Sequence, residues 1–92
     1  MKVLWEPRAA SVLRHLEPSV RKRLKHALRL LAQDPSGRSA RLDVKRLDTD
    51  DGAGIYRLRV GDWRMGFTID GAVLVLRIFH RDEGYGWLVD MA

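Results

Sequence analysis

Five arginines are spaced along the C-terminal half of the sequence in a pattern that suits phosphate binding: Arg57, Arg59, Arg64, Arg77 and Arg81. The planar guanidinium group stays charged and contacts a phosphate through two parallel hydrogen bonds. Alternate residues of a strand point to one face of a sheet. If the segments that carry these arginines pair as strands, their side chains form a cationic face for a polyanion such as RNA.

The segments that must position these arginines show the alternation of apolar and polar residues typical of strands. We predict strands over residues 55–60, 63–69 and 72–80. Gly61-Asp62 fits a type II′ hairpin turn, and Asp70-Gly71 fits a type I′ turn. The three segments therefore predict an antiparallel meander, in which each turn sets the register of the strands that it joins.

The turn at Gly61-Asp62 brings two of the arginines together. A two-residue loop at this point pairs Val60 with Trp63. It follows that Arg59 lies opposite Arg64. Like charges directly opposite each other on a sheet destabilise it by roughly 0.2–1 kcal/mol per pair, so this pairing favours a polyanion as occupant.

The turn at Asp70-Gly71 extends the same row to a third strand. A two-residue loop here pairs Ile69 with Ala72. On that register Arg64 also lies opposite Arg77, and three arginines form one row across three neighbouring strands.

The apolar residues of the three strands divide between two faces on this register. We expect the face toward the rest of the chain to carry Tyr56, Leu58, Val60, Trp63, Met65, Phe67, Ile69, Leu74, Leu76 and Ile78. We expect the arginine face to carry Val73, Val75 and Phe79. The alternative is a solvated face whose arginines stack on Phe79 or pair with nearby carboxylates, which explains one or two arginines better than five.

The N-terminal half predicts a short strand over residues 2–5 and two helices. Pro7 begins the first helix, whose apolar positions recur at i, i+3, i+4 and i+7. Pro18 ends that helix and begins a second one, which stops at residues 34–37. The two helices form an αα-hairpin. Residues 36–54 are predicted to be a loop, anchored to the core by Leu42, Val44 and Leu47.

Composition limits the class of protein. The chain has 92 residues, enough for a single domain over residues 1–92, and its formal charge is +5. This charge favours a polyanionic partner, the alternative being a basic protein without one. The sequence has no cysteine, and its histidines lack metal-ligand spacing, so we expect no metal and no cofactor. No apolar stretch approaches the roughly 18 residues of a membrane span; we expect no membrane contact and a cytoplasmic location.

Three further residues near the end of the chain have types that can contact RNA. His80 stands beside Arg81, where its ring can donate to a phosphate or make a structural hydrogen bond. Tyr85 follows in a segment flanked by glycines, and its hydroxyl can reach over the arginine face. Trp87 can be a packing anchor or a platform for a base, and packing is favoured.

The sequence resembles the RelE/ParE superfamily of bacterial toxins from toxin–antitoxin modules. The most specific match is the run YRLRVGDWR at residues 56–64, followed by His80-Arg81 and then Tyr85. The weaker matches are Val3-Leu4-Trp5 with Pro7 and Ala10, Leu31 with Asp34-Pro35, and Lys45-Arg46-Leu47. The resemblance implies an α+β fold, with an N-terminal strand and an αα-hairpin packed on a mostly antiparallel twisted sheet that ends in a three-strand meander.

The resemblance also implies an activity. RelE-like members cut mRNA in the ribosomal A site, without metal, through attack by the ribose 2′-OH on its neighbouring phosphate. The expected partners are the ribosome, mRNA and a cognate acidic antitoxin. The catalytic positions carried over are Arg57, Arg59, Arg64, Arg81 and Tyr85. Further RNA or phosphate contacts are expected from Lys45, Arg46, Arg77 and His80.

On this resemblance each catalytic position has an expected role. Arg64 grips the scissile phosphate, and Arg57 and Arg59 stabilise the charge that develops on it. Arg81 is the acid or the stabiliser of the leaving group, and Tyr85 is a stacking platform or the base. Some RelE-like members have lysines at the positions of Arg57 and Arg59, and arginine hardly yields a proton. The identity of the general base therefore stays open.

Two other functions fit the same residues. A ParE-like member would inhibit DNA gyrase by binding it, with no chemistry of its own. A non-catalytic RNA-binding module would use the arginine face only to hold phosphates. Arg81 together with Tyr85 favours the nuclease.

Overall fold

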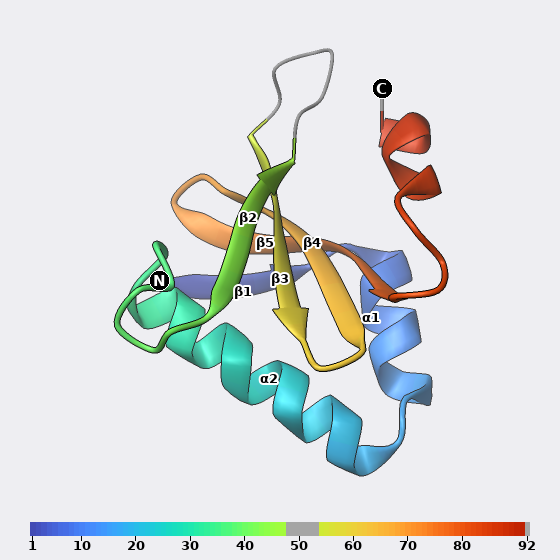
Figure 1. Ribbon diagram of the computed structural model, residues 1–92, viewed down its shortest axis with the longest axis horizontal. Helices are drawn as coiled ribbons and strands as arrows, with labels where there is room; N and C mark the ends of the chain where they lie inside the picture. The colour runs from blue at the N-terminus through green and yellow to red at the C-terminus, as the bar shows by residue number, and fades with distance from the viewer. Residues whose placement is uncertain (48–53, 92) are drawn as a thin grey trace.

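The computed structural model describes residues 1–47 and 54–91 and consists of two helices and a five-stranded mixed sheet (Figure 1). The elements in chain order are β1 (Lys2–Trp5), α1 (Pro7–His15), α2 (Pro18–Gln33), β2 (Asp43–Leu47), β3 (Ile55–Val60), β4 (Trp63–Ile69), β5 (Ala72–His80) and the 3-10 helix η1 (Gly86–Met91). The strand order is β1-β5-β4-β3-β2. Strand β1 runs parallel to β5, and the other pairs are antiparallel. The predicted α+β fold is confirmed.

Both helices begin at a proline, as predicted. The Glu6 side chain accepts a hydrogen bond from the Arg8 amide and so caps α1, which has Pro7 in its first turn. The helices bury one apolar face each against the sheet, through Ala9, Leu13, Leu24, Ala27, Leu28 and Leu31. Figure 1 shows the C-terminal segment (red) leading away from the end of β5.

The loop after α2 is held by one carboxylate. The Ser39 hydroxyl donates to Asp34 Oδ2 at 2.6 Å, and the Ser36 hydroxyl donates to Oδ1 at 2.7 Å. These hydrogen bonds, with that of Ser39 the largest cause, hold the pKa of Asp34 well below its usual range. The charged form of Asp34 therefore fixes the chain where α2 ends.

The predicted hairpin between β3 and β4 is confirmed. Val60 pairs with Trp63 and Arg59 with Arg64. Gly61 has φ +61°, whereas Asp62 is not among the residues with positive φ. A positive φ at the first turn position alone is the requirement of a type II′ turn.

The predicted turn between β4 and β5 is wrong by one residue. Ile69 pairs with Val73 rather than Ala72, and Gly71 has φ +70° while Asp70 does not have positive φ. A type I′ turn needs positive φ at both central residues, so the turn at Asp70-Gly71 is of another kind. The longer loop shifts β5 by one position relative to β4.

A β-bulge then shifts the register a second time. Phe67 pairs with Val75 but Gly66 pairs with Arg77, so Leu76 is the extra residue. As a result Arg64 lies opposite Phe79. The expected row of Arg59, Arg64 and Arg77 is therefore wrong in its third member.

The one-residue shift at the β4–β5 turn reverses the faces of the first half of β5, and the bulge restores them. Val73 and Val75 lie in the main core beneath the helices, whereas Leu74 and Leu76 lie in a second apolar cluster. The expected assignment of these four residues is therefore inverted. After the bulge the alternation is as predicted, with Ile78 in the main core. The expected core residues of β3 and β4 all belong to the main core or pack against it.

The segment expected to be a loop contains strand β2, which pairs with β3 along its whole length. The charged residues of β2 hid the strand pattern, and charge of this kind is common on an edge strand. The expected anchors are confirmed, since Leu42 and Val44 pack on the main core and Leu47 lies in the second cluster. Residues 48–53 of the expected loop lie outside the described residues.

The second cluster covers the side of the sheet away from the helices, which we call the open face. Its members are Leu47, Ile55 and Leu76, with Leu74, Trp87 and Leu88 packed against them. The start of η1 is thus held on the open face, beside the arginines. None of the described helices is long and apolar enough to span a membrane.

Candidate active site

The open face carries two rows of charged residues. The row nearer the β3–β4 turn runs from Asp43 through Arg59 and Arg64 to Phe79. Arg59 has a side chain 53% exposed, and its Nη1 lies 4.0 Å from Asp43 Oδ2. Arg64 Nη1 donates to the Gly61 carbonyl at 2.8 Å and to the Trp63 carbonyl at 3.2 Å. Among the described residues, no carboxylate lies within ion-pair distance of Arg64.

Arg81 lies at the same end of the open face, directly after β5. Its amide donates to the Asp62 carbonyl at 2.9 Å, which ties the end of β5 to the β3–β4 turn. Its guanidinium Nη1 lies 3.5 Å from Asp62 Oδ1, and the side chain is 60% exposed. Arg59 on β3, Arg64 on β4 and Arg81 directly after β5 therefore lie at one end of the sheet. We call these three residues the arginine cluster.

The second row lies deeper and runs from Lys45 through Arg57 and Gly66 to Arg77. Arg57 Nη2 lies 2.6 Å from Asp43 Oδ1, and its side chain is 13% exposed. Arg77 is 14% exposed, and its Nη1 contacts Glu6 Oε2 at 2.9 Å. Both guanidinium groups are thus half-enclosed and already paired with carboxylates, which suits them to hold strands together.

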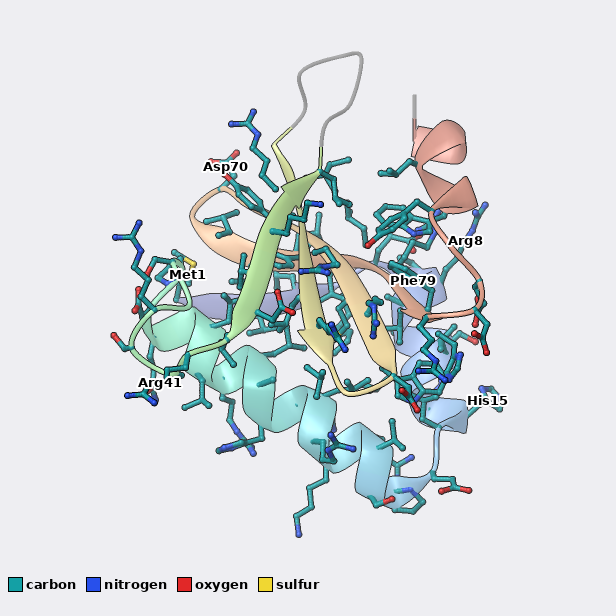
Figure 2. The ribbon with its side chains drawn as sticks, in the orientation of Figure 1. Met1, Arg8, His15, Arg41, Asp70 and Phe79 are labelled. Carbon is teal, nitrogen blue, oxygen red and sulfur yellow. The ribbon has the colours of Figure 1, made fainter. Side chains whose placement is uncertain are left out.

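Two aromatic side chains from the C-terminal segment stand over Phe79. The Tyr85 ring meets the Phe79 ring edge-on, with centroids 5.2 Å apart, and Tyr85 is 40% exposed. The Trp87 ring lies 5.6 Å from that of Phe79. Figure 2 shows Phe79 beside the chain that leads to η1. The Tyr85 ring therefore packs on the cross-strand neighbour of Arg64.

The other expected RNA contacts are divided by the fold. Lys45 lies on the open face, opposite Arg57, and is exposed. Arg46 pairs with Tyr56 and so points to the helix side. His80 also belongs to the helix side, where its ring meets that of Trp63 edge-on at 5.3 Å. Its Nδ1 lies 3.3 Å from Asp82 Oδ2, so His80 makes the structural interaction rather than facing the arginine cluster.

Sequence reasoning missed the ion pairs of Asp43 and the surface on which Trp87 packs. Asp43 contacts both Arg57 and Arg59, yet it falls in the segment that was expected to be a loop. The spacing of Leu42 and Val44, two residues apart, was the signal for a strand there. Trp87 packs as expected, but its contact with Gly66 could not be predicted because of the bulge.

A further group of cations lies on α2, away from the open face. The exposed basic residues of this helix, which we call the α2 stripe, are Lys22, Arg23, Lys25, His26 and Arg29. Figure 2 shows nitrogen-tipped side chains that project from α2 away from the sheet. The helix contains no acidic residue. Like charges three or four residues apart weaken an isolated helix, so the α2 stripe also favours an anionic partner.

The arginine cluster and Tyr85 provide cations and a phenol without a metal site. Among the described residues, no three His, Asp or Glu side chains are grouped so as to hold a metal ion. Guanidinium groups that are free of strong ion pairs and lie at one end of a sheet are suited to stabilise negative charge on a phosphate.

The fold and the open face define a class of small α+β protein with a cationic sheet. Residues 3–85 match the family described as the ParE toxin of the type II toxin-antitoxin system, parDE. The chain is also 30% identical over 88 residues to Toxin RelE3 of Methanocaldococcus jannaschii, covering 95% of this chain and 98% of that protein. The chain therefore belongs to the RelE/ParE superfamily of toxins from type II toxin–antitoxin systems, as the resemblance predicted.

Solved structures show the same fold. The archaeal RelE-RelB complex from Pyrococcus horikoshii contains a chain that matches with a TM-score of 0.74 and 22% identity, over 90% of this chain and 97% of that one. The RelB-RelE antitoxin-toxin complex from Methanococcus jannaschii matches with a TM-score of 0.66 and 26% identity, over 87% of this chain and 92% of that one.

Proposed function

We propose that this toxin is a ribosome-dependent endoribonuclease that cleaves mRNA through the ribose 2′-OH, without a metal ion. The observation that carries the proposal is the arginine cluster. Arg59 and Arg64 lie opposite each other on β3 and β4, Arg81 contacts the turn between these strands, and the Tyr85 ring packs on Phe79, the cross-strand neighbour of Arg64. We propose for these four residues the catalytic roles that the resemblance implies.

In the proposed reaction the 2′ oxygen bonds to phosphorus while the bond from phosphorus to the 5′ oxygen breaks. The products are a 2′,3′-cyclic phosphate and a 5′-OH. Negative charge grows on the non-bridging oxygens, where Arg64 and Arg59 supply donors. Arg81 stabilises the leaving 5′ oxygen, which takes a proton from water. Tyr85 stacks on a base of the RNA or accepts the proton of the 2′-OH.

The structure suggests a narrower role for Arg57 than direct catalysis. Its guanidinium is mostly enclosed and bound to Asp43. Asp43 also approaches Arg59, so this carboxylate joins the deeper row to the arginine cluster. We therefore assign Arg57 and Asp43 to positioning Arg59.

Two features support the ribosome as the site of action. The formal charge is +5, and exposed cations occur on the open face as well as on α2. A molecule with cations on two sides is better suited to bind in a cavity walled by RNA than to bind a single RNA strand. Action on translating ribosomes places the protein in the cytoplasm.

An acidic antitoxin is the second partner that we propose. The solved relatives are complexes of RelE with RelB. In this chain a pocket of about 170 Å³ between β1 and α2 is lined by Val3, Trp5, Lys25, Leu28 and Arg29. Its apolar floor and cationic rim suit a segment that combines apolar and acidic side chains.

Inhibition of DNA gyrase is the alternative function, and the match to the ParE family favours it. A gyrase inhibitor has no need of a phenol beside exposed arginines. Arg81 and Tyr85 therefore support the nuclease.

Induced expression without antitoxin, followed by mapping of new mRNA 5′ ends, separates the two functions. Cleavage in the reading frame of translated messages is expected. Arg64→Ala and Arg81→Ala are expected to abolish both cuts and growth arrest while the protein stays folded. DNA damage without mRNA cuts would support the gyrase inhibitor, and killing by both variants would contradict the nuclease.

A further inference from the structure

Two buried nitrogen atoms on the open face have no hydrogen-bond partner among the described residues. They are Arg57 Nε and Trp87 Nε1. Each carries an N–H group, and a buried N–H without an acceptor loses the full free energy of its hydration. Buried polar groups are nearly always paired, so an exception calls for a physical explanation.

Both side chains adjoin Gly66 of β4. Arg57 is the cross-strand partner of Gly66. The Trp87 ring rests on Gly66 so closely that an added Cβ would lie 2.6 Å from Trp87 Cζ2. Gly66 does not have positive φ, so space for the indole, rather than backbone conformation, requires glycine here.

The groups around the two N–H donors are cationic or already paired with carboxylates. The Nη2 of Arg57 is engaged by Asp43. Arg77, on the other side of Gly66, is engaged by Glu6. Lys45 stands exposed at the end of this row. An oxygen that carries negative charge is therefore the acceptor that this position favours.

We propose that Arg57 Nε–H and Trp87 Nε1–H form a donor pair for a phosphate oxygen of the bound RNA. This inference rests on the proposed function, because it concerns the phosphate next to the one held at the arginine cluster. Arg64 and Gly66 are two residues apart on β4, about 6.8 Å at roughly 3.4 Å per residue. That distance is comparable to one nucleotide step along a strand.

The chain that leads to Trp87 is loosely packed. Gly84 and Gly86 flank Tyr85, and neither has an atom within 4 Å of where a Cβ would stand. In the proposed complex the oxygen enters by a movement of the chain around Tyr85, while the Trp87 ring stays on Gly66.

The direct test observes the two N–H groups by NMR in the ¹⁵N-labelled 92-residue chain. The probes are inorganic phosphate and a short oligoribonucleotide whose 2′-O-methyl groups prevent cleavage, at constant ionic strength. The Trp87 indole and Arg57 Nε–H signals are expected to move downfield together and to saturate, while those of Trp5 and Trp63 stay in place. Signals that do not move, or that are already downfield without phosphate because a water or another acceptor is bound, would overturn the proposal.

Trp87→Phe gives a second test, in which stability and RNA affinity are expected to change in opposite directions. Phenylalanine keeps a ring on Gly66 and removes the unpaired N–H, so the melting temperature is expected to be unchanged or higher. The dissociation constant for the oligoribonucleotide is expected to rise about tenfold. Trp63→Phe is the control, because it removes an indole N–H from the helix side and should leave the affinity unchanged.

The outcomes separate this inference from the proposed function. Unchanged affinity in Trp87→Phe, with mRNA cleavage still dependent on Arg64 and Arg81, would overturn the donor pair alone. Phosphate-dependent shifts in a protein whose Arg64→Ala and Arg81→Ala variants still cut mRNA would keep the donor pair and reject the catalytic assignment.

Discussion

Arg59 and Arg64 lie directly opposite each other on β3 and β4. Arg64 donates to two backbone carbonyls, and the one carboxylate near Arg59 among the residues that the structure describes is the distant one of Asp43. Two like charges held this way weaken the sheet when it stands alone. A phosphate placed between them would relieve this repulsion, so the pair of arginines favours the binding of an anion.

Arg64→Gln is expected to separate stability from activity. The substitution removes the repulsion with Arg59, so the free energy of unfolding should be unchanged or higher by roughly 0.2–1 kcal/mol. Loss of a donor to the phosphate should lower the cleavage rate by roughly 10²–10³. Urea unfolding and cleavage of ribosome-bound mRNA measure the two effects. A clear loss of stability would contradict this account of the pair.

Arg77 and Arg81 are expected to respond in opposite ways to replacement by alanine. Arg77→Ala leaves Glu6 without its ion-pair partner between β5 and the start of α1, and should lower the free energy of unfolding by about 1–3 kcal/mol. Arg81 is exposed, so Arg81→Ala should change stability by less than about 0.5 kcal/mol while it abolishes cleavage. Thermal unfolding and mRNA cleavage, measured on both variants, test this division. A stable Arg77→Ala protein would refute the structural role of Arg77.

The α2 stripe is expected to control ribosome affinity and its salt dependence. The triple variant Lys22→Gln, Lys25→Gln, Arg29→Gln should bind ribosomes more weakly. The slope of log affinity against log salt should fall in magnitude by about 2, because the loss of three phosphate contacts reduces the number of counterions released on binding. Ribosome pelleting across a salt series measures both.

The matched control removes the same charge elsewhere, through Lys2→Gln, Arg8→Gln and Arg38→Gln. These side chains are exposed and lie off α2. Equal losses of affinity in both triple variants would show that net charge matters and the position of the α2 stripe does not.

Asp34 is expected to make stability depend on pH in acid. Hydrogen bonds from Ser39 and Ser36 lower the pKa of Asp34 in the folded protein, so the unfolded chain binds the proton first. The stabilising contribution is therefore complete above about pH 4, the ordinary range of an aspartate, and declines as pH falls through the lowered pKa. Urea unfolding as a function of pH should give a steeper acid loss for the wild type than for Asp34→Asn. Parallel curves would contradict the role of this carboxylate.

The sequence was sufficient to predict the β3–β4 hairpin, because the turn type and the alternation agreed. Gly61 supplied the positive φ that the turn needs. The apolar residues of β3 and β4 lie on one face only, so a slip of one residue would have moved all of them into solvent.

The register of β5 could not be predicted in the same way. Residues 72–76 are apolar at every position, so either face could have been the buried one. Both faces are in fact covered, by the helices on one side and by the start of η1 on the other. Alternation carries no information in such a segment, and a bulge inside it leaves no mark in the sequence.

The roles of the arginines required the structure because they depend on distant partners. Arg57 meets a carboxylate 14 residues away, and Arg77 meets one 71 residues away. All five arginines look alike in the alternating pattern. Only tertiary contacts divide them into two enclosed ion pairs, the half-buried Arg64, and the exposed Arg59 and Arg81.

The parallel pairing of β1 with β5 has a consequence for how this toxin is made. The first strand finds its partner only when Ala72 and the residues after it have been added to the growing chain. Tyr85 is added later still. A nascent chain emerges from the ribosome N-terminus first, so the five-stranded sheet cannot close until β5 has left the ribosome.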